Sequence, residues 1–166
     1  HATQTPHGKK TRDVKEPTGD PNELWSFGEQ NFRILKDLVL LRERLRPYIE
    51  AQMQTAAEKG WPVMRPMFFM YPEDEICYTL GEQYMYGDDI LFAPIVGKGQ
   101  TEKQVYLPSG RWVLTKDGKT YDAGWHTIHA QVDEFVAFVK DGAEVLSCFE
   151  SIDPETDEQT SSGLSF

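Results

Sequence analysis

Three clusters of acidic residues are the first places where this sequence could do chemistry. They are Glu73-Asp74-Glu75, Asp88-Asp89 and Asp133-Glu134. Two carboxyl groups held close together can act as a general acid and a nucleophile. Each cluster also has a structural explanation. The first follows Pro72 and suits the start of a helical turn, and the third suits a solvated strand connection. The second follows Gly87 in a turn, where its side chains would bond their own backbone. The residues by themselves therefore identify no catalytic pair.

The histidines do not predict a metal site. His126 and His129 lie three residues apart in a segment expected to be a strand, and an odd spacing sends them to opposite faces of a sheet. His7 lies in a polar segment and is expected to be solvated. The sequence contains no GxGxxG, P-loop, GxSxG or HExxH motif. We therefore expect no metal and no other cofactor.

The tryptophans and cysteines are expected to pack in the protein interior. An indole face suits a sugar ring, but each tryptophan lies near Gly or Pro in a core-like segment, which favours burial; they are Trp25, Trp61, Trp112 and Trp125. Cys77 and Cys148 are far apart and show no CxxC or metal spacing. This pattern favours two reduced thiols in a cytoplasmic protein and leaves a single disulfide open.

Charge and hydropathy exclude two classes of partner. The formal net charge is −10, with +1 on residues 1–60 and −11 on residues 61–166. Phosphate binding needs clustered cations, so an acidic second half disfavours nucleic acid. No run of residues approaches the length and apolarity of a membrane span, and the first residues lack the apolar core of a signal peptide. With 166 residues and 39% hydrophobic content the chain can build a real core.

The elements that would position these side chains are helices followed by strands. Apolar residues recur every three or four positions from Glu29 to Lys59, which predicts a helix with one wide apolar face. Pro47 should kink or break that helix near Arg46, and Gly60 should end it as a left-handed cap. The first twenty residues read as a loop, and Asp20 with Pro21 as a short helix start.

After Gly60 the pattern changes to short strands separated by turn residues. We expect strands at 63–70, 83–86, 90–96, 104–107, 111–115, 120–131 and 135–140. The Gly87-Asp88-Asp89 turn should join the second and third strands in a hairpin, and Pro108-Ser109-Gly110 should turn the fourth back onto the fifth. Residues 116–119 should form another turn before the sixth strand. The fold class is thus α+β: helices first, then an antiparallel β-sandwich. The acidic tail after Phe149 is expected to be disordered.

Two arginines precede prolines in apolar surroundings. Arg65 lies before Pro66 and Arg46 before Pro47. A buried arginine must be paired with a carboxylate or with backbone carbonyls. We expect both side chains to be buried and paired where the helices meet the strands.

Five ordered motifs together resemble the C-terminal part of glycoside hydrolase family 31, the α-glucosidases and α-xylosidases. They are LRERLRPYI, RPMFF, YPEDE, EQYMYGDDILFAPIV and VYLPSGRW, all between Leu41 and Trp112. The resemblance implies that residues 1–61 are the loop and last helices of a (β/α)8 catalytic barrel. Residues 62–149 would be a C-terminal β-sandwich domain, and 150–166 an acidic tail.

The resemblance also implies a retaining hydrolase of α-linked glucosides or xylosides whose two catalytic aspartates lie upstream of this chain. No carboxylate here corresponds to them, so the chain alone is expected to be inactive and to have the rest of the barrel as its partner. His1 stands at a fitting distance before Trp25-Ser26-Phe27-Gly28-Glu29 to be the family histidine that contacts the bound sugar. The same residue is equally explained as the remnant of a tag.

Two alternatives remain open at this point. The chain could be a stand-alone, non-catalytic module for carbohydrate binding or assembly, and its apolar helical face could then form a homo-oligomer. It could also be a free-standing hydrolase that uses Asp88 and Glu73, which is the least favoured interpretation because of the turn assigned to Asp88.

Overall fold

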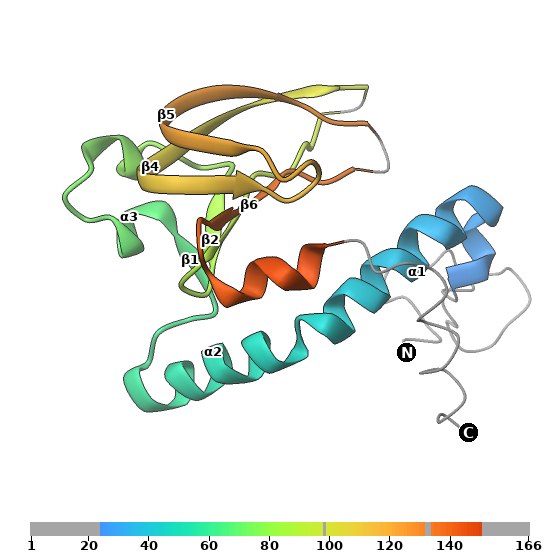
Figure 1. Ribbon diagram of the computed structural model, residues 1–166, viewed down its shortest axis with the longest axis horizontal. Helices are drawn as coiled ribbons and strands as arrows, with labels where there is room; N and C mark the ends of the chain where they lie inside the picture. Colours follow the sequence, from blue (N-terminus) through green and yellow to red (C-terminus); the bar gives the residue numbers. More distant parts are fainter. Residues whose placement is uncertain (1–23, 98, 132–133, 151–166) are drawn as a thin grey trace, which may run out of the picture. The chain divides into compact units, whose positions relative to one another are not determined.

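The computed structural model describes residues 24–97, 99–131 and 134–150. It separates into two compact units, with the boundary between Arg44 and Leu45. The first unit contains the 3-10 helix η1, Leu24–Phe27, and the helix α1, Glu29–Arg44. The second begins with α2, Arg46–Lys59, and continues into an antiparallel sheet (Figure 1). Within the described residues, no helix is both long and apolar enough to cross a bilayer.

The predicted break in the long helix is confirmed. Helix α1 ends at Arg44 and α2 begins at Arg46, with Leu45 between them. Pro47 lies in the first turn of α2, where its missing N–H removes no helical hydrogen bond. Gly60 ends α2 in the left-handed conformation, φ 73°, and its N–H donates to Ala56 O at 2.9 Å. This cap was also predicted.

Six strands form one antiparallel sheet in the order β1-β2-β3-β6-β4-β5. The edge strand β1, Met64–Pro66, is shorter than predicted, because Met67–Met70 turn into the short helix α3. The expected strand over 63–70 is therefore wrong in its second half. Pro66 lacks a ladder N–H and ends the strand, and the turn of α3 buries Met67 in the core.

The predicted hairpin around Gly87 is confirmed. Strand β2, Tyr84–Tyr86, pairs with β3, Ile90–Phe92, and the register places Met85 opposite Leu91. Residues 93–96, which were expected to extend β3, are not in a strand. Gly87 has φ 66°, a conformation that side chains with a Cβ rarely adopt.

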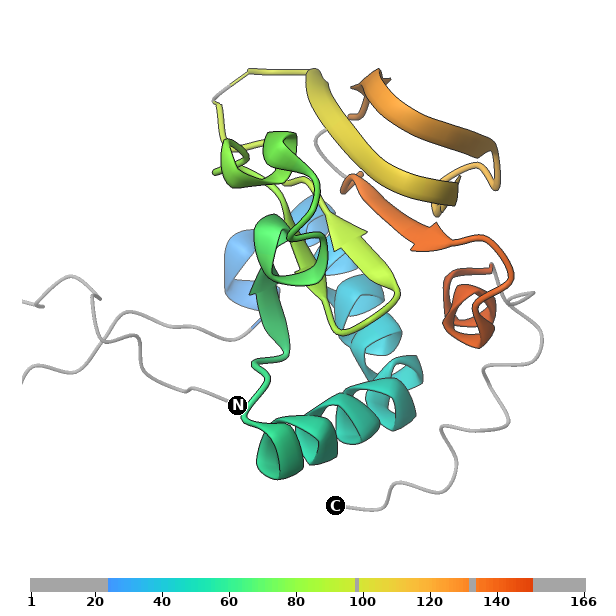
Figure 2. The same ribbon diagram turned by 90° about the vertical axis from the view of Figure 1, so that its left-hand side faces the viewer.

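The second expected hairpin is wrong. Residues 102–114 form one long strand, β4, and Pro108-Ser109-Gly110 is an irregularity inside it, where the register shifts between Leu107 and Arg111. The real turn lies at 115–119, and β4 pairs across it with β5, Thr120–His129. The indole N–H of buried Trp112 donates to Pro108 O at 3.0 Å, which holds the irregular segment in place. Both strands are long and curved (Figures 1 and 2).

The core lies on the inner side of this curved sheet. Strand β6, Ala137–Lys140, pairs with both β3 and the end of β4, and so links the two halves of the sheet. The 3-10 helices η2, Glu75–Tyr78, and η3, Glu144–Phe149, complete the described chain. The largest side chains of the core cluster are Met67, Met85, Leu91, Leu107, Trp112, Leu114 and Phe138. The antiparallel β-domain after the helices agrees with the prediction.

Candidate functional site

A buried arginine joins α2 to the sheet. Arg65 on β1 is 0% exposed. Its guanidinium forms an ion pair with Asp88 and donates to Gln52 Oε1 on α2 at 2.9 Å, while its Nε donates to Pro62 O at 2.7 Å. The prediction of a paired, buried Arg65 is confirmed. Arg46 differs, because it is exposed at the start of α2.

The Asp88 carboxylate has a long-range role that was not predicted. Instead of bonding its own turn, it accepts hydrogen bonds from Arg65 and from Gln52 Nε2, the latter at 3.3 Å. Partial burial favours the protonated form of Asp88, but these hydrogen bonds and the charge of Arg65 outweigh it, so the pKa of Asp88 is lowered. Asp88 is thus held ionised by its neighbours.

Tyr48 ties the same turn to α2. Its hydroxyl donates to Tyr86 O at 2.9 Å and accepts from the N–H of Asp89 at 3.0 Å. Burial raises the pKa of Tyr48 to about 12. A Cβ added at Gly87 would lie 2.4 Å from the Tyr48 hydroxyl, so glycine is required here by space as well as by φ. Helix α2 and the hairpin are therefore joined by closely packed, hydrogen-bonded polar side chains.

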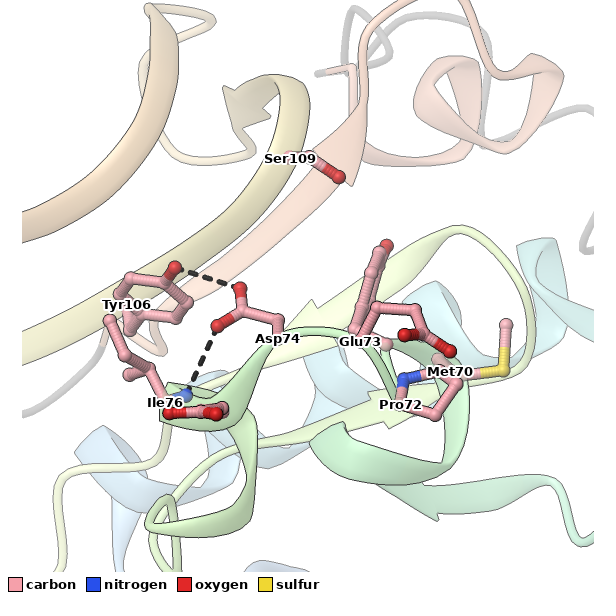
Figure 3. A pocket seen from close by; sticks show the side chains of 9 residues that line it. Met70, Pro72, Glu73, Asp74, Ile76, Tyr106 and Ser109 are labelled. Atoms are coloured by element: carbon pink, nitrogen blue, oxygen red, sulfur yellow. Dashed lines mark hydrogen bonds between the residues drawn. The ribbon is translucent and has the colours of Figure 1, made fainter.

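An open hollow lies on another part of the sheet domain, between η2, the segment before it and β4 (Figure 3). Its wall includes Glu73, Asp74, Glu75, Tyr106 and Ser109. Asp74 caps η2 by accepting from the N–H of Ile76 at 3.1 Å, and its other oxygen accepts from the Tyr106 hydroxyl at 2.8 Å. The prediction that Glu73-Asp74-Glu75 begins a short helical turn is confirmed.

Tyr106 is held firmly at the edge of this hollow. The hydrogen bond to Asp74 is the main reason that the pKa of Tyr106 is raised, to about 12. Its backbone N–H donates to Gln83 Oε1 at 2.9 Å, and its carbonyl accepts from Gln83 Nε2 at 2.7 Å. A single buried glutamine side chain therefore fixes this part of β4 against the start of β2. Tyr106 is therefore held both at its hydroxyl and at its backbone.

The carboxyl groups whose pKa is displaced in the described residues all share one direction of shift. A general acid needs a raised pKa. In the described part of the chain, the carboxyls with a displaced pKa all have it lowered; they are Glu82, Asp88, Asp117 and Glu134. Burial opposes the shift for Asp88 and Asp117, and nearby hydrogen-bond donors overcome it, whereas for Glu82 and Glu134 the donors are the largest influence.

The last acidic cluster is only partly described. Asp133 lies outside the described residues. The Glu134 carboxylate accepts from Lys116 Nζ at 3.0 Å and from the N–H of Gln131 at 2.8 Å. Glu134 thus closes a local connection instead of being simply solvated, which the sequence did not indicate.

His126 and His129 differ in burial, as expected for residues on opposite faces of a strand. His126 contacts Asp122 O at 2.8 Å and packs its ring against Tyr121. His129 is exposed, and its Nδ1 lies 3.8 Å from a carboxylate oxygen of Glu102. Across residues 24–97, 99–131 and 134–150, no three His, Cys, Asp or Glu residues gather in a way that could hold a metal ion. His1 and His7 lie outside the described residues, so the proposed sugar contact of His1 stays a prediction.

The tryptophans divide into two groups. Trp112 is fully buried, as predicted, but Trp25 is 71% exposed, Trp125 53% and Trp61 39%. The expectation that they pack in the core is wrong for these three. Neither Cys77 nor Cys148 is in a disulfide bond, and burial raises the pKa of the Cys77 thiol to about 11.

Comparison with known proteins places this domain in a family. Residues 60–145 match the family described as the glycosyl hydrolase family 31 C-terminal domain. The chain belongs to glycosyl hydrolase family 31. The resemblance noted in the sequence motifs is therefore confirmed. The match runs from Gly60, which caps α2, through the whole sheet to the start of η3.

Named relatives in family 31 are much longer than this chain. Alpha-glucosidase 2 from Bacillus thermoamyloliquefaciens is 37% identical over 124 residues, which are 74% of this chain and 16% of that protein. Sulfoquinovosidase from Escherichia coli K12 is 35% identical over 134 residues, 80% of this chain and 20% of that protein.

A solved family 31 structure has the same arrangement. The crystal structure of a GH31 α-xylosidase from a soil metagenome, complexed with xylose, superposes with a TM-score of 0.79 at 38% identity. It matches 86% of this chain but 22% of its own. The chain thus spans about a fifth or less of the family 31 proteins described here.

Sequence reasoning missed the pairing of Tyr106 with Trp125. The two residues lie opposite each other on β4 and β5. They were not paired because an additional turn was expected at Pro108-Ser109-Gly110, which would have folded 104–107 onto 111–115. The turn at 116–119 was expected too, and its Asp-Gly dipeptide is the stronger hairpin signal, so giving it priority would have found the pair.

Proposed function

We propose that this chain is the C-terminal portion of a retaining α-glycosidase of family 31 that hydrolyses α-linked glucosides or xylosides. The observation that carries the proposal is the family match over residues 60–145 in a chain that spans 16% of an α-glucosidase and 22% of an α-xylosidase. On this proposal the catalytic aspartates belong to a barrel segment outside the chain. The lowered pKa values of the displaced carboxyls support it, since a general acid needs the opposite shift.

In this assignment η1, α1 and α2 are the last helices of the catalytic barrel, and the curved sheet is the β-sandwich that follows it. The apolar surface supports this interpretation. Trp61 contacts Phe69 edge to face at 5.6 Å, and Phe68 stacks on Tyr78 at 5.3 Å, yet all four side chains are exposed. Trp61, Phe68 and Phe69 lie within three residues of the edge strand β1 along the chain, and soluble proteins avoid leaving apolar side chains uncovered at a sheet edge. The rest of the enzyme is the partner that would cover them.

An activity assay tests the proposal. The purified 166-residue chain should not hydrolyse nitrophenyl α-glucoside or α-xyloside, because it holds only the supporting domain. Adding the separately expressed preceding segment of the same gene should restore hydrolysis, as complementing fragments do when a large apolar interface rejoins them. Turnover by the chain alone, or a preceding gene segment with no barrel and no pair of aspartates, would contradict the proposal.

The second candidate is a stand-alone assembly module, and one observation favours it. Within the described residues, α1 has no buried side chain, and Leu38, Val39 and Leu40 are each at least 40% exposed. An apolar helix face of this kind could associate with a second copy. Light scattering over a range of concentrations separates the two candidates: a dimer that persists after the preceding segment is added favours the module, and one that is replaced by a heterocomplex favours the glycosidase.

We also propose a cytoplasmic location, on the basis of the two cysteines, which form no disulfide bond with each other. Thiol labelling of the protein in freshly lysed source cells tests this, since both cysteines should react after denaturation without prior reduction. Recovery of the protein from the culture medium would contradict it.

A further inference from the structure

Trp125 is an exposed tryptophan in the middle of a regular strand. It lies on β5 opposite Tyr106 on β4, with ring centroids 5.3 Å apart at an interplanar angle of 56°. Strand positions on the other face of the same hairpin are filled by core residues such as Val105 and Ile128. The exposed indole therefore belongs to the outer face of β4 and β5.

The outer face beside Trp125 is lined with hydrogen-bonding side chains. The next pair along the same face is Gln104 and Thr127, both exposed, with Gln104 Nε2 donating to Thr127 Oγ1 at 2.7 Å. On the opposite side, Tyr106 forms part of the wall of the hollow together with Glu73, Asp74 and Ser109 (Figure 3). An apolar ring thus stands between an amide and hydroxyl pair and a hollow whose wall combines carboxylates with apolar side chains.

The aromatic pair is also rigid before any ligand arrives. Asp74 holds the Tyr106 hydroxyl, and Gln83 holds its backbone on both sides. Because its pKa is raised to about 12, the Tyr106 phenol stays protonated and keeps donating to Asp74 throughout the neutral range. Preorganised aromatic side chains with few rotatable bonds lose little entropy on binding.

This combination matches the chemistry of a sugar chain. A pyranose ring presents a face of C–H groups, which pack on an exposed indole, and a rim of hydroxyls, which bond to amides, hydroxyls and carboxylates. A cross-strand aromatic pair that served the sheet alone would need no such polar surround. Nucleic acid is a poor alternative, since Glu73, Asp74 and Glu75 would repel phosphates.

We propose that the outer face of β4 and β5 around Trp125 and Tyr106 binds the pyranose units of α-linked glucans. The ligand class rests on the proposed function, whereas the location rests on the exposed aromatic pair and its polar neighbours. Trp125 supplies the apolar platform, Tyr106 fixes its orientation, and Gln104 and Thr127 contact sugar hydroxyls.

Affinity electrophoresis of the full chain in gels containing dextran or soluble starch tests the proposal. At least one of the two glucans should retard the wild-type chain, and Trp125→Ala should weaken that retardation about tenfold or more. Trp25→Ala is the matched control, because it removes another exposed tryptophan that belongs to η1 and not to β4 or β5. That variant should migrate like the wild type in every gel.

Several outcomes overturn the proposal. They are the absence of retardation by either glucan, equal retardation of wild type and Trp125→Ala, and an equal loss in Trp25→Ala. If Trp125→Ala fails to fold, as judged by its thermal transition, Gln104→Ala decides the matter. It should weaken retardation about fivefold through one lost hydrogen bond, and an unchanged mobility would contradict the proposal.

The result is separable from that of the proposed function. Glucan binding concerns this face alone, whereas the proposed function is tested by hydrolysis with and without the preceding segment. A chain that complements activity but is not retarded would overturn the binding face and leave the enzyme assignment intact.

Discussion

Helices α1 and α2 follow each other with one residue between them and yet have opposite relations to the described structure. Helix α1 carries the stronger apolar stripe, and none of its residues is buried within the described chain. Helix α2 has the weaker apolar stripe, and it is fixed to the sheet by Tyr48 and Gln52, which reach the β2–β3 turn and Arg65. An apolar stripe on a helix predicts that some surface will cover that face. Specific polar contacts, such as those of α2, identify the surface to which a helix is fixed.

Replacing Gly87 should do the most to break the contact between α2 and the sheet. Gly87→Ala combines a left-handed φ with a Cβ placed inside Tyr48 and Gln52, so we expect a loss of roughly 4 kcal/mol in the free energy of unfolding. Gly118→Ala is the matched control, because it has φ 69° and open space around the added Cβ. It should cost about 1 kcal/mol. Equal losses in urea denaturation would show that the close approach to α2 is unimportant.

Removing the charge of Asp88 should have the next largest effect. Asp88→Asn leaves the buried Arg65 without its ion-pair partner and should cost about 2 kcal/mol at pH 7. Asp141→Asn is the control: both aspartates have side chains that are 43% exposed, but the partner of Asp141, Arg111, is itself exposed. That substitution should cost less than about 0.5 kcal/mol.

The effect of Asp88→Asn should also depend on pH in a defined direction. The pKa of Asp88 is lowered in the folded state, so its stabilisation is complete above the unfolded pKa and is lost as pH falls through the folded one. The difference between wild type and Asp88→Asn should therefore shrink below about pH 4. A constant difference from pH 7 to pH 2 would contradict the ion-pair explanation.

Tyr48→Phe should have a smaller effect on the same contact. It removes one donated and one accepted hydrogen bond at the turn and should cost about 1.5 kcal/mol. In the wild type, the pKa of Tyr48 is raised to about 12, so its contribution is complete below the unfolded pKa, about 10, and is lost as pH rises toward 12. Alkaline unfolding followed by circular dichroism should therefore be less steep in Tyr48→Phe than in the wild type.

A substitution on α1 should have the smallest effect on stability. Leu38→Ala on α1 should change the stability of this chain by less than about 0.5 kcal/mol, because the side chain is 41% exposed and the helix buries nothing. In a complex with the preceding segment of the enzyme, the same substitution should cost considerably more. A large loss in the isolated chain would show that α1 already has a partner within it.

Local rules predicted those parts of the fold in which neighbours in sequence decide the outcome. The break before Arg46, the Gly60 cap and the hairpin at Gly87 follow from what Pro and Gly allow the backbone to do, and all three are confirmed. Burial of Arg65 was also predictable, since an arginine between apolar residues has few other options. Its partner Asp88 was assigned to a local role, because the sequence does not show that α2 approaches the turn.

The errors arose where two local signals competed. Pro108-Ser109-Gly110 has the composition of a turn, but the chain continues through it as β4, because Trp112 can then enter the core and bond back to Pro108. The exposure of Trp125 was missed for the same reason, since its face of the sheet depends on the register of β4 and β5. Register is fixed by pairing between distant segments.

The sequence by itself determined the family, the order of helices before strands and the positions where the backbone must turn or end. These properties depend on residue type and on spacing within a few positions along the chain. Only the tertiary structure decided that Asp88 serves Arg65 and that the exposed Trp125 lies beside the half-buried Tyr106. Each of these depends on which distant surfaces meet, and side-chain chemistry alone allows several such meetings.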